Sequence, residues 1–372
     1  MGHRRRKRKW PGPWKAVKRC VLFFTTICVI PLLLVLLVTT DQYLRPLKHS
    51  FTRQENGIVD KVFYMRPRKD RINQTAVLAR LKSRQKHLYE TCRALGLDKI
   101  GNDSLHRPNA WEFLVNDEHH LVWCNVFKAA STSWMYNFNL LAGYSAKFLK
   151  KTKAVPLSLA RKKYPRPSPQ ALMDAMENSL SFLIVRHPLE RLLSAYRDKL
   201  QYSLPHTYHR QLGNKIIIKY RKKEQSKTTP NYRWPTFPEF VDFLLDCVKK
   251  NRPLDMHWTP ITEFCTPCLF KFDVIAHTET LQEDQQYIIE KAHLDNLIEP
   301  QWKNAGHGPT SRQVKKYYTK LTKTQILKLY HLYRYDFQLF NYSLKGYLEL
   351  GLPDDEFKAS ENKGIEISSN DI

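Results

Sequence analysis

Two segments of the chain combine basic and hydroxyl side chains at spacings suited to binding anionic groups. In one of them Arg186 is followed by Arg191 and Ser194, and a helical period places the latter two on one face. Arginine offers paired donors that match phosphate oxygens, and lysine offers a compact positive charge. Both segments therefore predict a site for a phosphate-bearing ligand. The candidate ligand-binding residues of the other segment are Lys128, Ala129, Ala130, Ser131, Thr132 and Ser133.

The elements around Lys128 would form a phosphate cradle. Leu121–Phe127 is an apolar, β-branched and aromatic run that predicts a buried strand, and Ser131 to about Ala142 predicts a helix capped by a hydroxyl residue. The first backbone N–H groups of a helix lack internal partners and attract an anion. The Walker A pattern is absent, which disfavours a nucleotide kinase. A strand-to-helix turn that binds nothing is the alternative interpretation.

The segment around Arg186 repeats this arrangement of a strand, a turn and a helix. Phe182–Val185 predicts a buried strand that ends at Arg186, and Leu189–Leu200 predicts a helix with Pro188 near its first turn. In α/β sheets, ligands bind beyond the carboxyl ends of the strands. Two such sites after two consecutive strands imply one ligand with two separated anionic groups.

Apolar runs and helical periods continue to alternate along the chain. Phe270–Ala276 predicts a third strand, and a helix is expected from Glu279 onward. Alternating strands and helices indicate an α/β fold with a parallel sheet flanked by helices. Residues 147–169 predict a loop or short helices, and residues 201–233 predict a long loop. Two more helices are predicted at Phe237–Val248 and Leu321–Leu339.

The chain is strongly basic, since its 372 residues include 61 Lys and Arg against 35 Asp and Glu. Nine of the basic residues lie in residues 1–19, and the remainder keeps a large excess. Such an excess predicts a polyanionic partner: nucleic acid, an anionic membrane, or a sulfated or carboxylated glycan. The segments Lys147–Arg166 and Lys215–Lys227 are candidates for binding a polyanionic chain. The alternative is that both are ordinary solvated surface.

The N-terminal region predicts how the chain is oriented in a membrane. Residues 20–40 carry no charge and are long enough to span a bilayer, and the basic residues 1–19 before them would stay in the cytosol. A cleaved signal peptide is the alternative. The rest would lie in a secretory lumen, as a stem at 41–105 with an amphipathic helix over 75–95, a folded domain at 106–346 and a polar tail at 347–372.

Two further features agree with a lumen, where the partner would be a glycan or nucleotide and not genomic nucleic acid. Three N-glycosylation sequons begin at Asn73, Asn102 and Asn341. An oxidising lumen would also pair some cysteines, although their odd number beyond the predicted anchor leaves the pairing open. We interpret Cys265 and Cys268 as structural disulfide cysteines, because no second Cys-x-x-Cys or spaced His pair supports a zinc site. The cysteines concerned are Cys92, Cys124, Cys247, Cys265 and Cys268.

The segment from Arg186 to Asp198 carries the most specific motif of the chain. It reads Arg-His-Pro-x-Glu-Arg-Leu-x-Ser-Ala-Tyr-Arg-Asp. This string resembles the Golgi carbohydrate sulfotransferases of the HNK-1 and chondroitin/dermatan 4-O-sulfotransferase group, which use 3′-phosphoadenosine 5′-phosphosulfate. The resemblance covers residues 106–346 and implies a P-loop-like sulfotransferase fold in a type II membrane protein of the Golgi. It continues through residues 264–268, 272–275, 279–281 and 333–337.

This resemblance implies roles for both segments. Lys128 and the turn at 129–133 would hold the 5′-phosphosulfate, and Arg186 with Ser194 would hold the 3′-phosphate. Sulfate would pass to a sugar hydroxyl by in-line displacement, with Lys128 stabilising charge on the leaving phosphate oxygen. The first segment departs from the family's pattern, which indicates a divergent branch and leaves its acceptor open. The departures lie at Phe127, Ala129, Ser131 and Ser133.

The proposed transfer also needs a general base for the attacking hydroxyl. We predict His257, because imidazole titrates near neutral pH and its segment lies between a predicted helix and the cysteine pair. A purely structural His257 is the alternative, and His187 is a second candidate. The reaction needs no metal.

The predicted function is sulfate transfer from 3′-phosphoadenosine 5′-phosphosulfate to a glycan. The expected acceptor is position 4 of N-acetylgalactosamine in chondroitin or dermatan. The alternatives are another sugar hydroxyl, on a uronic acid or a terminal glycan, and a catalytically inactive glycan-binding membrane protein.

Overall fold

The computed structural model describes residue 14 and residues 73–221, 233–300 and 309–354. Apart from residue 14, these residues belong to one unit of the chain, Arg71–Ile372. Within the described ranges no helix is both long and apolar enough to cross a membrane. The anchor predicted at residues 20–40 lies outside these ranges.

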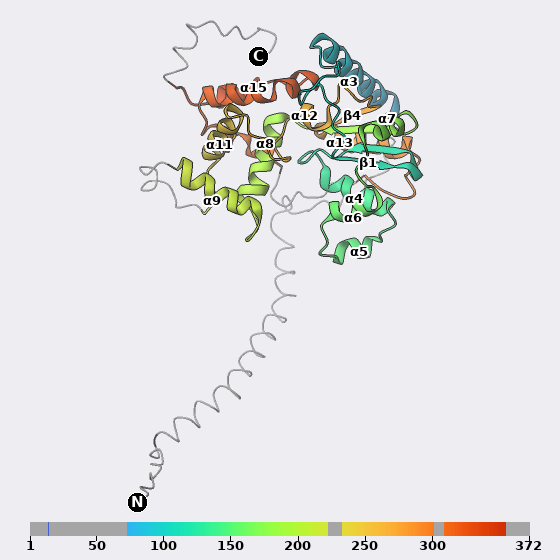
Figure 1. The fold of residues 1–372 in the computed structure, drawn as a ribbon, viewed down its shortest axis with the longest axis horizontal. Coiled ribbons are helices and arrows are strands. Elements are labelled where there is room, and N and C mark those ends of the chain that lie inside the picture. The colour runs from blue at the N-terminus through green and yellow to red at the C-terminus, as the bar shows by residue number, and fades with distance from the viewer. Residues whose placement is uncertain (1–13, 15–72, 222–232, 301–308, 355–372) are drawn as a thin grey trace, which may run out of the picture. The chain divides into compact units, whose positions relative to one another are not determined.

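A four-stranded sheet stands at the centre of one half of this unit (Figure 1). β2, β3 and β4 run parallel, with Cys124 beside Leu183 and Leu183 beside Ile275. The carboxyl ends of β2 and β3 therefore lie next to each other, which brings together the two segments expected to bind anions. In spatial order the strands are β1 (Phe113–Asn116), β2 (Leu121–Cys124), β3 (Leu180–Val185) and β4 (Val274–His277).

The predicted α/β class is confirmed, but the expectation of a fully parallel sheet is wrong, because β1 pairs antiparallel with β2. Four residues join these strands, and three of them form a 3-10 turn, Asp117–His119, before His120 adopts left-handed backbone. A parallel connection needs a dozen or more residues, so this link permits only a hairpin. With four residues, β1 offers too short a pattern for sequence analysis to detect.

Aromatic packing fixes α4 (Ser131–Leu141) on the sheet. The ring of Trp134 lies 4.4 Å from that of Phe182 on β3, and Phe138 lies 5.4 Å from Trp123 on β2. All four rings are buried, so the N-terminus of α4 is held rigidly beyond the end of β2. α6 (Pro156–Lys163) packs on α4, while α3 (Gln74–Ala94) and α13 (Leu281–Lys291) pack beside β4.

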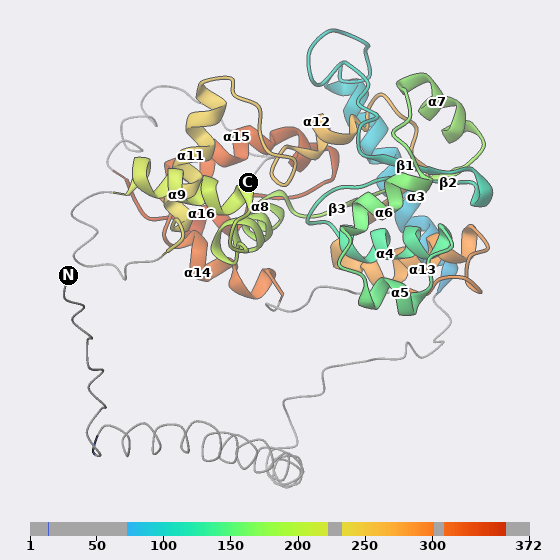
Figure 2. The same cartoon turned by 60° about the horizontal axis from the view of Figure 1, so that its bottom comes forward.

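A second apolar cluster lies among helices that form the other half of the unit (Figure 2). The predicted helices at 237–248 and 321–339 are confirmed, as are short helices within 147–169, but the long loop predicted at 201–233 contains a helix. Of that helix only Gly213 and Ile216 are buried, which explains its weak apolar period. The cluster involves α8 (Pro188–Tyr196), α9 (Tyr208–Tyr220), α11 (Phe237–Lys249), α14 (Val314–Tyr318), α15 (Lys323–Leu339) and α16 (Tyr347–Leu350). The remaining α-helices of the described ranges are α5 (Ala146–Lys151), α7 (Pro169–Glu177) and α12 (Ile261–Cys265).

The helix expected within a stem, α3, is part of the folded unit. Its residues Val77, Leu81 and Leu88 are buried in the core around the sheet. Its basic face is also engaged, since Arg80 and Arg84 each pair with the buried carboxylate of Asp284 at 2.8 Å. Folded structure therefore begins upstream of the predicted boundary at residue 106.

The start of the predicted C-terminal tail also packs on the folded unit. The N–H of Leu352 donates to the carbonyl of Leu321 at 2.8 Å, and the carboxylate of Asp354 accepts from Thr324. Residues 355–372 lie outside the part of the chain that the structure describes.

Two disulfides crosslink distant parts of the fold, Cys92 with Cys268 and Cys124 with Cys265. The structural role predicted for Cys265 and Cys268 is confirmed, and each of them bonds a distant cysteine instead of its neighbour. Cys124 ends β2 and Cys265 ends α12, so their bond anchors α12 beside the first of the two segments expected to bind anions. Cys247 is a buried free thiol.

Candidate active site

The turn after β2 places a lysine at the N-terminus of α4. Lys128 and Ala130 both have left-handed backbone, with φ of 69° and 57°, a conformation that costs a residue other than glycine about 1–3 kcal/mol. Ala130 is the N-cap of α4 and makes no side-chain capping bond, so the predicted hydroxyl cap is wrong. An alanine cap supplies no side-chain oxygen to the first N–H groups of the helix, and this arrangement suits an external anion.

Arg186 joins the second segment to the first. It directly follows β3, and its Nη1 donates to the backbone carbonyl of Lys128 at 3.3 Å. Its Nη2 pairs with Glu190, one turn along in α8, at 3.1 Å. The side chain is 16% exposed, so it is partly accessible to solvent. The two basic groups that sequence analysis expected at one ligand do lie together.

Asp198 and Lys199, in the turn that follows α8, lie close to the ammonium of Lys128. Oδ2 of Asp198 lies 3.2 Å from Nζ of Lys128 and 3.2 Å from Nζ of Lys199. Burial lowers the pKa of the Lys128 ammonium, and Asp198 opposes this effect. Burial would raise the pKa of Asp198, but the two ammonium groups together lower it. These residues lie in a π-helical turn, Arg197–Gln201, a feature common at functional sites.

Arg191 has a different environment from the one that sequence analysis expected. Its side chain is buried, and its guanidinium donates to the carbonyls of Phe127 at 2.9 Å, Thr259 at 2.7 Å and Met256 at 3.5 Å. The helical period correctly placed Arg191 on one face of α8, but that face points into the protein. In this structure Arg191 ties the loop at 256–259 to the residue before Lys128.

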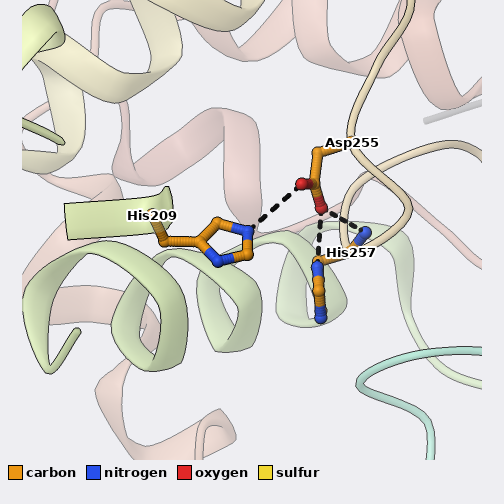
Figure 3. A group of neighbouring side chains, drawn as sticks. All are labelled: His209, Asp255 and His257. Carbon is orange, nitrogen blue, oxygen red and sulfur yellow. Dashed lines mark hydrogen bonds and ion pairs between the residues drawn. The ribbon is translucent and has the colours of Figure 1, made fainter. Parts of the chain in front are cut away.

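That loop carries His257, the predicted base, beside the first segment. The rings of His257 and Phe127 lie 4.8 Å apart. Nδ1 of His257 lies 2.6 Å from Oδ1 of Asp255, whose other oxygen lies 3.1 Å from Nε2 of His209 on α9 (Figure 3). A carboxylate at Nδ1 favours the tautomer with a proton on Nδ1, which leaves Nε2 to accept a proton. The arrangement fits a base oriented by a carboxylate.

Burial, more than the surrounding charges, keeps the imidazole of His257 neutral. Burial lowers its pKa, Asp255 raises it, and Lys199 and His209 lower it further, with a net decrease. Burial would raise the pKa of Asp255, but its hydrogen bonds with the two histidines lower it strongly. Asp255 is therefore a carboxylate and His257 a neutral imidazole at pH 7, which is the protonation state that a general base requires.

His209, Asp255 and His257 are also a group whose ligand atoms could surround a metal ion. One ligand atom from each lies within 4.8 Å of the others, and this is the only such group in the described ranges. Both oxygens of Asp255 already accept hydrogen bonds from the two rings, so the cluster is satisfied without an ion.

Removal of divalent cations is therefore expected to leave transfer unchanged. The measurement is the transfer rate after dialysis against a chelator, with and without added Zn²⁺ or Mn²⁺. A loss of activity that a divalent cation restores would show that this cluster holds a functional ion.

The other predicted residues are distributed between the surface and the core. Thr132 is exposed, Ala130, Ser131 and Ser194 are half-buried, and Ala129 and Ser133 are buried. His187 is held by the carbonyl of Ser343 at 3.0 Å and stacks on Tyr347, which fits a role in shaping the turn before α8. The asparagines of the three sequons, Asn73, Asn102 and Asn341, are exposed.

Four residues of the site were not singled out from the sequence: Asp198, Lys199, Asp255 and His209. Asp198 ends the quoted motif, and Asp255 lies two residues before His257, so a search for acidic neighbours of the predicted groups would have found both. No sequence signal joins His209 to His257, since only the fold brings α9 against the loop at 254–259.

Several basic residues of the segments 147–166 and 215–227 form ion pairs within the fold. Arg161 and Arg166 each bond the buried carboxylate of Glu112 at 3.2 Å. In the second segment Lys219 pairs with Asp246 at 2.7 Å, and Arg221 pairs with Glu239 at 2.9 Å. Residues 222–227 of that segment lie outside the described ranges. Binding of a glycan by the exposed lysines of both segments stays a prediction.

The fold and site together define a class of transferase. Parallel strands β2 and β3 each end in a basic turn followed by a helix, and a neutral imidazole lies beside the first turn. A family model described as Sulfotransferase family matches residues 111–343. The chain therefore belongs to the sulfotransferase family, as a carbohydrate O-sulfotransferase that uses a sulfate donor as co-substrate.

The chain is similar to several carbohydrate sulfotransferases. It is 29% identical to carbohydrate sulfotransferase 11 of Mus musculus over 75% of this chain and 80% of that protein. It is 30% identical to carbohydrate sulfotransferase 8 of Mus musculus, over 62% of this chain and 56% of that protein. It is 31% identical to carbohydrate sulfotransferase 14 of Danio rerio, over 62% of both chains. No solved structure matches the chain.

Proposed function

We propose that this enzyme transfers a sulfuryl group from 3′-phosphoadenosine 5′-phosphosulfate to position 4 of N-acetylgalactosamine in chondroitin or dermatan. The observation that carries the choice of donor is the bond from Arg186 to the carbonyl of Lys128. It places the guanidinium of Arg186 against the turn that carries Lys128, so basic residues from two separate strand ends border one site, as a ligand with a 5′-phosphosulfate and a 3′-phosphate requires. The motif from Arg186 to Asp198 supports the acceptor.

In this proposal the cradle and the second segment divide the donor between them. Lys128, with the N-terminus of α4 and the half-buried Ser131, binds the 5′-phosphosulfate, and Arg186 with Ser194 binds the 3′-phosphate. When the donor binds, Lys128 exchanges its ion pair with Asp198 for contacts with the donor. Asp198 keeps its ion pair with Lys199, so its negative charge stays neutralised. Arg191 does not contact the donor. Its guanidinium fixes the position of the first segment relative to α8 through its bonds to the carbonyl of Phe127 and to the loop at 256–259.

The chemical step needs one proton acceptor and one stabilised leaving group. Nε2 of His257 takes the proton of the attacking hydroxyl, while Asp255 stabilises the imidazolium that forms. The sugar oxygen attacks sulfur in line with the bond that breaks, and the leaving phosphate oxygen gains charge. Lys128 stabilises that charge from a partly buried position, where a fixed ammonium is more effective than water.

We also propose that the protein is a single-pass type II protein of the Golgi membrane, anchored by residues 20–40, with the catalytic domain in the lumen. The two disulfides support an oxidising compartment. The exposed asparagines of the three sequons support glycosylation there. A luminal glycan is then the partner, and nucleic acid is not.

The test is sulfate transfer by the full-length enzyme from a radiolabelled donor to desulfated chondroitin, dermatan and heparosan. We expect labelled chondroitin or dermatan, with 4-sulfated N-acetylgalactosamine among the digested disaccharides. Arg186→Ala is expected to weaken adenosine 3′,5′-bisphosphate binding about 10–100-fold, because it removes a charged donor. Label on a uronic acid or a terminal sugar would reject the proposed acceptor, and unchanged nucleotide binding by Arg186→Ala would reject the proposed 3′-phosphate site.

A further inference from the structure

The first turn of α9 is tied to the proposed base. His209 lies in that turn, and its Nε2 bonds Asp255, whose other oxygen bonds Nδ1 of His257 (Figure 3). The rings of His209 and His257 also meet edge to face, with centroids 5.2 Å apart. The position of Tyr208, the neighbour of His209, is therefore fixed relative to the reacting groups.

Tyr208 presents its ring to solvent at this place. The residue is 66% exposed, and its ring meets that of His209 edge to face at 5.3 Å. Thr207, the N-cap of α9, accepts from the N–H of Arg210, and its own hydroxyl donates to the carbonyl of Leu204. These bonds order the segment ahead of Tyr208, so its ring is presented on a built surface and not on a loose loop.

Other large apolar side chains are exposed next to the two histidines, in the segment ahead of α9 and in the loop that carries His257. Leu204 is 71% exposed, just ahead of α9, and Met256 is 39% exposed, just before His257. Exposed large apolar side chains mark a binding surface where they gather beside a functional site, and they need no explanation where they are scattered singly. Here they flank the two histidines of the site, which makes the acceptor the molecule expected to cover them.

The charge and shape of this surface fit a sugar chain. A pyranose ring has an apolar face of C–H groups and a polar rim, and an aromatic ring provides a flat apolar partner for that face. Lys199 supplies a positive charge at the site, since its Nζ lies 3.2 Å from Asp198 and its charge lowers the pKa of His257. An acidic glycan would therefore meet a cation near the reacting centre and an aromatic ring beyond it.

We propose that Tyr208 is an acceptor-binding platform, on which a sugar ring next to the sulfated residue of an acidic glycan stacks. This rests on the proposed function, since it assumes that His257 faces the acceptor hydroxyl. Tyr208 touches the acceptor but no reacting atom, so its loss acts on acceptor binding. The donor site, formed by Lys128 and Arg186, is separate from it.

The test compares Tyr208→Ala with the wild-type full-length enzyme. We expect the acceptor KM to rise about tenfold, with kcat at saturating acceptor, the donor KM and the affinity for adenosine 3′,5′-bisphosphate unchanged. Tyr208→Trp is expected to restore the acceptor KM, because it restores a flat ring. Ile218→Ala is the matched control, since Ile218 is 84% exposed at the far end of the same helix, and it is expected to change nothing.

A second measurement separates this proposal from the function on which it rests. Calorimetry with a desulfated chondroitin hexasaccharide, in the presence of adenosine 3′,5′-bisphosphate, reports acceptor binding without transfer. Equal binding by Tyr208→Ala and wild type would overturn the platform and leave the proposed function standing. A wild-type enzyme that neither binds nor sulfates chondroitin, dermatan or heparosan would overturn both.

Discussion

Replacing Lys128 with alanine is expected to reduce kcat/KM for sulfate transfer about 10²–10³-fold, the loss typical when one fixed donor to a developing charge is removed. The side chain of Lys128 is 18% exposed, and its ammonium is held 3.2 Å from Asp198 at the N-terminus of α4. Charge develops on the leaving phosphate oxygen as the sulfuryl group departs, and an ammonium already in place stabilises it without reorganisation. Transfer from a radiolabelled donor measures the effect.

The substitution should leave the fold intact, for two reasons. Asp198 keeps Lys199 as a partner at 3.2 Å, so no uncompensated carboxylate is created. Alanine and lysine also carry the same backbone strain at a φ of 69°. The matched control is Lys82→Ala, which removes an exposed lysine from α3 and should retain activity. A Lys128→Ala enzyme with wild-type kcat/KM would contradict the proposed role of the cradle.

Local sequence patterns were sufficient to locate the two segments that we propose to bind anions. The runs at Leu121 and Phe182 are apolar enough to identify buried strands, and each is followed by its basic turn within a few residues. Parallel pairing of β2 and β3 then makes the meeting of Lys128 and Arg186 a consequence of topology. These features depend on residues close together in the sequence, which is why they could be predicted.

The remaining features of the site depend on tertiary contacts. Periodicity identified the face of α8 that carries Arg191, but the burial of that face is decided by the loop at 256–259 and by Phe127. α9 has few buried residues, so its pattern resembles a basic loop, and the bond from His209 to Asp255 spans 46 residues. Disulfide pairing and the packing of α3 on β4 likewise join distant parts of the chain.

Replacing His257 with alanine is expected to lower kcat about 10²–10⁴-fold, the usual contribution of a positioned general base. The affinity for adenosine 3′,5′-bisphosphate should not change, because His257 lies on the acceptor side in the proposed arrangement. Asp255 would still accept bonds from His209 and from the backbone N–H of residue 257, so the loop should persist. His331→Ala, which removes an exposed histidine from α15, is the matched control. A His257→Ala enzyme with normal kcat would assign the proton transfer to another group.

The pH profile of Asp255→Asn distinguishes a base oriented by a carboxylate from a merely structural histidine. Transfer requires neutral His257, so kcat falls as the pH drops through the pKa of this imidazole. Asp255 raises that pKa, against the lowering effects of burial, Lys199 and His209. Asparagine keeps an oxygen for Nδ1–H but removes the charge, so the acidic limb of the profile should move to lower pH. Its maximum rate should also fall, because a neutral amide stabilises the imidazolium less than a carboxylate does. An acidic limb that stays in place would show that His257 does not carry the proton.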